Sequence, residues 1–396
     1  PPIALRAAAI VAATAAAIPL VYLLVRAGES GLAAIVETLS RGRVLEYAAN
    51  SLGLAAATTA TALVLGTAVA FVLTRVRVPF ARTWLLISAL PLAVPSYLAG
   101  YGWLVAVPSL NGFVPSWVLL TAVTVPYVTL PVAAALRGAS GDLEGVARTL
   151  GRGPLRAFLV ATWPSVRPAA IAGSLLVALY ALSDFGLVAM MRFPTLTWGI
   201  NAAYSASFDR AQAATLALLL VVLALVVVVG ERAARRQLPR AAARAVAPRS
   251  VGRGMLVALL PVVAVAPLIG VGVPLLGLLS RLLEAATLRE IDVPRLLEAV
   301  GSTVGVAVAA ALLAVALALP IAALASRHRG RLVTAIESVG YLGHALPGIV
   351  VGLSLVFFAL AVVPALYQSI VVLVFAYAVL FMPKAIGTMR AGLGDV

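Results

Sequence analysis

Residues 141–168 read GDLEGVARTLGRGPLRAFLVATWPSVRP, a polar stretch between two long apolar runs. Asp142 is a favourable N-cap, and apolar residues then recur at the i, i+3, i+4, i+7 spacing of one helix face: Leu143, Val146, Ala147 and Leu150. Gly151 follows where a helix often ends on a left-handed residue, and Pro154 suits the first turn of a second helix. The stretch therefore predicts a helix-turn-helix whose first helix has an apolar face.

The flanking runs place this helix-turn-helix at a membrane surface, where no lipid covers the apolar face. A protein partner that receives the helix in a groove would cover it. The alternative is a helix that lies among the lipid headgroups, which would suit four arginines: Arg148, Arg152, Arg156 and Arg167. The residues alone leave both interpretations open.

The composition makes membrane spans the primary structure. Of the 396 residues, 63% are hydrophobic and 11% are charged, whereas ordinary soluble chains carry about 25% charged residues. We therefore expect an all-α polytopic membrane protein. Ten apolar runs are long enough to span, near residues 7–25, 52–74, 84–106, 117–136, 169–190, 213–230, 255–279, 301–325, 339–360 and 366–382. We interpret the first run as a retained helix, because no clear small-residue cleavage site precedes Glu29.

The basic residues predict the topology. If the N-terminus is cytoplasmic, most of the 29 Lys and Arg fall on the cytoplasmic side, and acidic residues offset those on the opposite side. The formal net charge of +15 is therefore typical of a topology signal and of contact with anionic membrane lipid. It does not indicate a nucleic-acid partner.

The chain repeats itself with a period of about 252 residues. Residues 93–96 (AVPS) return as residues 345–348 (ALPG), and Leu130-Pro131 returns as Met382-Pro383. We interpret residues 1–230 as a first half that contains the helix-turn-helix segment 137–168. Residues 231–254 are then a basic cytoplasmic linker, and residues 255–396 are a parallel second half. The second half stops at the start of its own helix-turn-helix, so twelve spans are expected in all.

Residues for ATP or metal chemistry are scarce. The single lysine, Lys384, is followed by Ala385, so the Gly-Lys-Ser/Thr sequence of a phosphate-binding loop is missing and any nucleotide energy must come from another subunit. The chain has no Cys and only two His, His328 and His344, which form no ligand pattern. We predict no catalytic residue, no metal site and no cofactor bound by this chain.

Asp184 follows the apolar residues after the helix-turn-helix. About sixteen residues at about 1.5 Å each place it about 24 Å from the inner surface, towards the outer leaflet. An ionisable residue at such depth is a candidate for a translocation pathway. A helix cap, or an ion pair with Arg192, is the alternative, and both stay open.

Proline and glycine interrupt two apolar runs at corresponding places in the halves: Pro91, Pro95, Gly100 and Gly102, then Gly340, Gly343, Pro347 and Gly348. Irregular backbone at membrane depth is tolerated where it lines a cavity. Tyr97, Tyr101 and Tyr341 would offer hydroxyls to a polar substrate there. We predict a pathway that includes Pro95, Tyr97, Tyr101, Asp184, Tyr341 and Pro347, with ordinary kinked packing as the alternative.

The helix-turn-helix resembles the coupling loop of binding-protein-dependent ABC importer membrane subunits, whose pattern is E-A-A, three residues, G, nine residues, I-x-L-P. Ala147, Gly151 and Pro164 match, whereas Gly145 stands at the Glu position, with Glu144 one place earlier. The resemblance implies a helix seated in a cleft of a separate ATPase. The implied coupling residues are Asp142, Leu143, Glu144, Gly145, Val146, Ala147, Leu150, Gly151 and Pro164.

A longer stretch is similar to the fused, two-half membrane subunits of ferric-iron importers, through ALSDFGL at 181–187, PTLT at 194–197 and FDR at 208–210. This resemblance implies an ABC ATPase dimer that carries ATP and Mg, and a periplasmic or lipid-anchored binding protein that delivers Fe(III). It also implies a multi-pass protein of the bacterial inner membrane. Related fused subunits handle thiamine or phosphonates, so these substrates stay open.

Two other classes of membrane protein are alternatives to an ABC importer subunit. An ion-driven secondary transporter would need acid pairs or a proton relay within the spans, which offer little beyond Asp184 and Glu337. A membrane-embedded enzyme would need a nucleophile–base pair or a metal cluster, and the sequence suggests neither.

Overall fold

The computed structural model describes residues 2–29, 31–139, 142–205, 209–236, 248–284, 292–344 and 346–394. Nearly all of these residues are helical, and the extended pairing found among them is one isolated β-bridge between Val76 and Arg249. The all-α prediction is confirmed.

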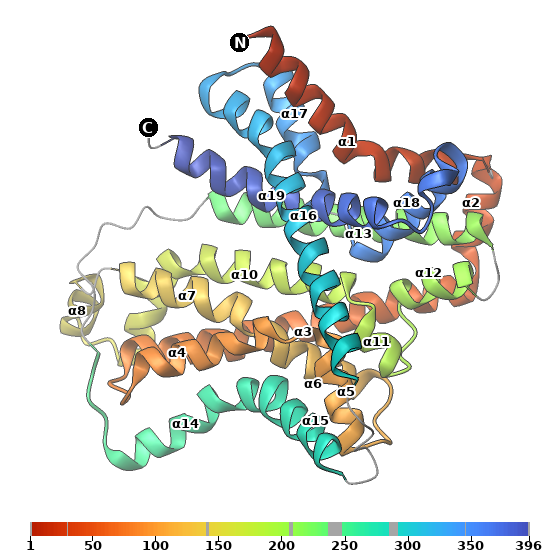
Figure 1. Cartoon of the computed structure of the whole chain (residues 1–396). Helices are drawn as coiled ribbons and strands as arrows, with labels where there is room; N and C mark the ends of the chain where they lie inside the picture. Colours follow the sequence, from red (N-terminus) through yellow and green to blue (C-terminus); the bar gives the residue numbers. More distant parts are fainter. Residues whose placement is uncertain are drawn as a thin grey trace. The chain divides into compact units, whose positions relative to one another are not determined.

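The helices are shown in Figure 1 and are listed here in chain order. They are α1 (Ile3–Gly28), α2 (Gly31–Ser40), α3 (Gly42–Arg75), α4 (Ala81–Ala89), η1 (Leu90–Ala93), α5 (Ser96–Ala106), α6 (Phe113–Thr124), α7 (Pro126–Gly138), α8 (Asp142–Thr149), α9 (Pro154–Ala157), η2 (Phe158–Thr162), α10 (Trp163–Ser183), α11 (Gly186–Met190), α12 (Leu196–Ser205), α13 (Arg210–Arg236), α14 (Arg253–Pro267), η3 (Leu268–Gly272), α15 (Val273–Leu283), α16 (Val293–Arg327), α17 (Arg331–Gly340), η5 (Leu342–His344), α18 (Gly348–Val362), η6 (Pro364–Leu366) and α19 (Ile370–Gly394).

Eight helical segments of the described residues are long and apolar enough to cross a membrane. The pair 81–93 and 96–106 passes the same test when taken together, but it bends by 92° at its break, as a broken span or a re-entrant loop does. The remaining expected run, 339–360, contains η5 and most of the shorter apolar helix α18. The protein is therefore a multi-pass membrane protein, and the two interrupted runs are those in which the sequence places proline and glycine.

The chain divides into two compact units, and each is described by itself. Unit 1 comprises Pro1–Leu45, Gly199–Leu225 and Leu288–Val396, and unit 2 comprises Glu46–Trp198 and Val226–Thr287. These units do not follow the halves 1–230 and 255–396 along the sequence. The first helix of each half, α1 or α14, lies in the unit that holds most of the other half. The division into repeated halves itself stays a prediction.

The range 231–254, expected as a linker, overlaps the ends of two helices. Helix α13 continues to Arg236, and α14 begins at Arg253. Residues 237–247 lie outside the described residues.

Unit 2 is held together by close contacts among α3, α7 and α10. Their shared core consists mainly of small and β-branched residues: Ala62, Ala70, Val125, Val128, Val132, Ala133, Leu136, Val166, Ala170 and Val177. A Cβ at Gly173 of α10 would lie 2.5 Å from the backbone oxygen of Tyr127 in α7. Since lipid supplies little hydrophobic drive between helices, such small residues at the interface let the backbones pack closely.

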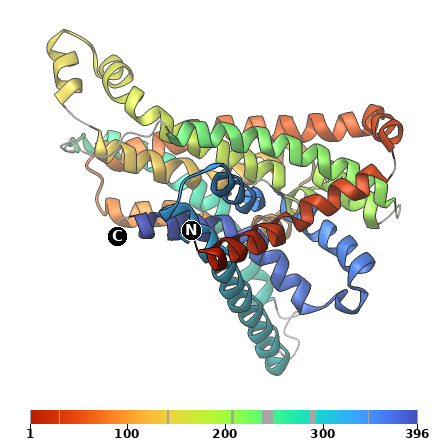
Figure 2. The same ribbon diagram turned by 90° about the horizontal axis from the view of Figure 1, so that it is seen from above.

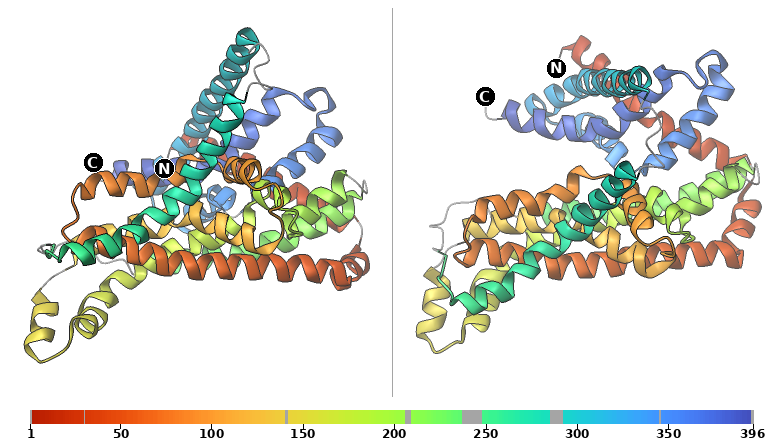
Figure 3. Two further views of the ribbon diagram at one scale, coloured as in Figure 1. Left: turned by 90° about the horizontal axis from the view of Figure 1, so that it is seen from below. Right: turned by 60° about the horizontal axis from the view of Figure 1, so that its bottom comes forward.

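Helix α5, the second arm of the bent pair, is packed between two neighbours in unit 2. A Cβ at Gly102 would lie 2.5 Å from Cα of Pro274 in α15, and one at Gly186 of α11 would lie 2.8 Å from Cβ of Tyr97. Figure 3 shows α5 together with α15. These contacts fix α5 on two sides.

In unit 1, α1 packs against α16, α17 and α18 (Figure 2), and its core cluster also includes residues of α19. Ala9, Ala12, Ala13 and Ala16 recur at helical spacing and form one buried face of α1. Ile321 of α16 and Ile386 of α19 belong to the same core cluster. Helix α1 is therefore part of the folded unit, in line with its interpretation as a retained helix.

Candidate functional site

The helix-turn-helix forms as its sequence predicts. Helix α8 ends at Thr149 and is capped by Gly151, which has a φ of +81°; the N–H groups of Gly151 and Arg152 donate to the carbonyls of Arg148 and Ala147 at 3.0 and 3.2 Å. This pair of bonds is the Schellman motif of a glycine C-cap. Helix α9 begins at Pro154 and continues through η2 into α10; Figure 2 shows α8 in yellow at the far end of this helical segment.

The apolar residues of α8 divide into two groups. Ala147 is buried, whereas 56% of Val146 and 76% of Leu150 are exposed. The side chains of Asp142 and Leu143 lie outside the described residues. Two large apolar side chains on one exposed helix face form a small apolar surface, and the adjoining π-helical turn exposes Leu159 and Val160 as well.

Glu144 attaches α8 to the rest of unit 2. Its Oε2 accepts a hydrogen bond from Thr162 Oγ1 at 3.2 Å, and its Oε1 lies 3.8 Å from Nη2 of Arg249. Thr162 ends η2, and Pro164 lies in the first turn of α10. Of the implied coupling residues, Glu144 thus faces the protein while Gly145, Val146 and Leu150 face outward.

Asp184 is buried and fully engaged in unit 2. Its Oδ1 accepts from the backbone N–H groups of Leu187 and Val188 at 3.0 and 3.4 Å, and its Oδ2 accepts from Ser96 Oγ. The carboxylate therefore caps α11 and joins it to the first turn of α5. These contacts match the capping alternative; a role in a pathway stays a prediction.

The remaining pathway residues differ in exposure. Tyr97 and Tyr101 lie one turn apart on α5 and are 51% and 48% exposed; Pro95 beside them is exposed. In unit 1, Pro347 is buried at the start of α18, and Tyr341 is half-buried against the α1–α16–α17–α19 core. Within unit 2, the face of α5 that carries Tyr97 and Tyr101 is the part of the predicted pathway that is open to a substrate.

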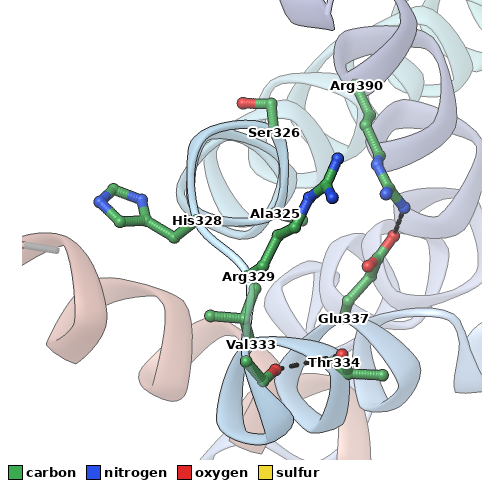
Figure 4. A pocket seen from close by; sticks show the side chains of 9 residues that line it. Ala325, Ser326, His328, Arg329, Val333, Thr334, Glu337 and Arg390 are labelled. Atoms are coloured by element: carbon green, nitrogen blue, oxygen red, sulfur yellow. Dashed lines mark hydrogen bonds and ion pairs between the residues drawn. The ribbon is translucent and has the colours of Figure 1, made fainter.

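The sequence did not predict a polar cavity of about 520 Å³ in unit 1, between the α16–α17 turn and α19 (Figure 4). Arg390 forms an ion pair there with Glu337, so Glu337 is not an isolated acid. His328 points away from this pair in Figure 4. Within the described ranges, no group of three His, Asp or Glu is placed to hold a metal ion, and the side chain of His344 lies outside them.

The multi-pass α-helical fold and an exposed helix-turn-helix of this spacing are typical of transport permeases. The chain belongs to the family of ABC transport-system permeases. It is 32% identical over 383 residues to the Fe(3+)-transport system permease protein FbpB 2 of Haemophilus influenzae, covering 95% of this chain and 76% of that protein.

Two further relatives match shorter parts of the chain. The molybdenum transport system permease protein ModB of Mycobacterium bovis is 30% identical over 235 residues, 54% of this chain and 87% of that protein. The putrescine transport system permease protein PotI of Escherichia coli is 28% identical over 171 residues, 41% of this chain and 61% of that protein. No protein-family model matches the chain.

Proposed function

We propose that this chain is the membrane permease of an ATP-driven importer whose cargo is ferric iron. The choice of ferric iron rests on how much of the chain each relative matches. The Fe(3+)-system permease matches 95% of the chain, whereas the molybdenum and putrescine permeases match 54% and 41%. ATP and Mg are bound by separate ATPase subunits, since the chain offers no phosphate-binding loop.

We infer that the ATPase docks on α8. Val146 and Leu150 present an exposed apolar face next to a rigid glycine cap, which is the form of a helix received in a groove. The arginines that would favour a headgroup location, such as Arg148 and Arg152, are also exposed. Two apolar side chains and a fixed helix end give a modest free energy of docking. A contact that moves in every transport cycle requires such a modest free energy.

The same proposal places the protein in a bacterial inner membrane with a cytoplasmic N-terminus, because that orientation puts most of the 29 Lys and Arg inside. A periplasmic or lipid-anchored binding protein delivers the cargo on the opposite side. Tyr97 and Tyr101, whose hydroxyls share an exposed face of α5, are the side chains proposed to contact the cargo.

Reconstitution tests this function. The chain, its ATPase and its binding protein are placed in sealed vesicles, and uptake of ferric iron is measured with and without ATP. We expect uptake that requires ATP and the binding protein. Uptake driven by an ion gradient without nucleotide would instead support a secondary transporter. Mass spectrometry of the binding protein's ligand separates iron from molybdate, putrescine, thiamine and phosphonates.

A further inference from the structure

Residues 248–250, near the end of the expected linker 231–254, are fixed to another part of unit 2. The N–H of Arg249 donates to the carbonyl of Arg75 at 2.9 Å, and the N–H of Arg77 donates to the carbonyl of Arg249 at 2.8 Å. These two bonds form the isolated bridge between Val76 and Arg249. This segment belongs to the expected cytoplasmic linker 231–254, and its backbone is fixed to the end of α3.

The side chain of Arg249 extends from this bridge to α8. Its Nη2 lies 3.8 Å from Oε1 of Glu144. The side chain of Glu144 is only 13% exposed and that of Arg249 is 53% exposed, so one end of the pair is shielded from water. Because the other carboxylate oxygen of Glu144 accepts from Thr162, this one residue connects α8 both to η2 and to the chain that begins the second half.

A second guanidinium lies behind the pair. Arg75 is only 7% exposed, and its Nε, Nη1 and Nη2 have no hydrogen-bond partner among the residues that the structure describes. Glu144 attracts its charge and Arg249 repels it. A buried cation without a partner is costly, and Glu144 is the carboxylate whose charge favours this cation.

We propose that Arg249 is a positioning residue for the coupling helix, and that the segment 248–250 moves with α8. This inference rests on the proposed docking of the ATPase on α8. A displacement of α8 passes through Glu144 to Arg249, whose backbone is only four residues before the start of α14 at Arg253. The segment 248–250 is then a mechanical connection between the ATPase contact and the first helix of the second half.

The test measures ATP hydrolysed per ferric ion imported, in the reconstituted complex of the full chain. Arg249→Gln removes the cation, and we expect the ratio to rise about two- to fivefold, the range of a partly exposed ion pair. Arg249→Lys keeps the charge, so its ratio of ATP hydrolysed per ferric ion imported should stay near that of the unaltered protein. Arg253→Gln is the matched control, because Arg253, the first residue of α14, is an exposed arginine with no ion pair among the described residues.

A double-mutant cycle identifies the partner. If Arg249 acts through Glu144, the double variant Glu144→Gln with Arg249→Gln raises the ratio no further than the larger single effect. Additive effects would overturn the assignment. Because the chain contains no cysteine, a spin label at Thr149→Cys reports on α8 alone, and Arg249→Gln should increase its mobility whether or not uptake is measurable.

The outcomes separate the two proposals. If the unaltered protein shows no ATP-dependent uptake, the proposed function fails, and the spin label still tests the contact. If the unaltered protein is coupled but Arg249→Gln and Arg253→Gln give equal ratios and equal label mobility, the positioning role of Arg249 is overturned while the proposed function stands.

Discussion

Asp184 shows how one buried side chain organises unit 2. Its carboxylate satisfies two N–H groups at the start of α11 and the hydroxyl of Ser96 at the start of α5. A carboxylate that accepts three hydrogen bonds in a buried position is held firmly, and its removal would leave the N–H groups of α11 unpaired. The same contacts keep the exposed tyrosines of α5 in a fixed orientation.

We predict that Asp184→Ala lowers the free energy of unfolding by about 1–2 kcal/mol, the usual cost of a lost N-cap. Asp184→Asn should recover most of this loss, because the amide oxygen still accepts from the backbone of α11. Thermal unfolding in detergent, followed by tryptophan fluorescence, measures both variants. Equal stability of the alanine variant and the unaltered protein would contradict the capping role, and iron uptake by the stable asparagine variant tests the pathway prediction separately.

Gly173 permits the close contact of α10 with α7. A Cβ there would lie 2.5 Å from the oxygen of Tyr127, so Gly173→Ala should destabilise the protein by about 1–3 kcal/mol through overpacking. Gly53→Ala in α3 is the control, because a Cβ at Gly53 meets nothing within 4 Å. Pulse proteolysis in detergent compares the two, and a loss no larger for Gly173→Ala than for Gly53→Ala would contradict the packing argument.

At the scale of elements, α8 combines a rigid end with a weakly covered face. The Schellman motif at Gly151 fixes where the helix stops; the exposed Val146 lies in its last turn, and the exposed Leu150 follows its last residue. A helix that docks on an ATPase needs both the rigid end and the uncovered face. The face makes the contact, and a frayed end would absorb the displacement that the helix should transmit.

We expect Val146→Asp and Gly151→Val to uncouple ATP hydrolysis from uptake. The first places a charge in an apolar contact, and the second forces a β-branched residue into a left-handed conformation, at a cost of about 1–2 kcal/mol. Gly153→Ala is the control, since Gly153 has an ordinary φ and open space. Uptake at the unaltered rate in the first two variants, at equal membrane levels, would count against docking at α8.

At the scale of the whole molecule, the compact units cut across the order of the sequence. Helix α1 packs with helices of the second half, and α14 and α15 pack with helices of the first. Each half of the sequence therefore contributes its first helix to the unit formed mainly by the other, so neither half is expected to fold as a separate domain.

A substitution in α1 tests this arrangement. Ala16 is fully buried in the α1–α16–α17–α19 core, and Ala16→Leu should lower the thermal stability of the whole protein by about 1–3 kcal/mol. Ala8→Leu, on the exposed side of the same helix, should have little effect. If both variants unfold at the same temperature, α1 is not an integral part of unit 1.

The sequence by itself determined the features whose physical cause is local. Long apolar runs require helices because backbone groups in lipid must bond internally, and the spacing of Asp142, Ala147 and Gly151 determines the helix-turn-helix. Proline likewise determines the break in the run 84–106. Only the tertiary structure decided that Asp184 caps α11 against Ser96, that Arg249 contacts Glu144, and which helices share a unit. These contacts join residues dozens to more than a hundred positions apart, and a buried arginine such as Arg75 carries no local signal that distinguishes it from the arginines that set the topology.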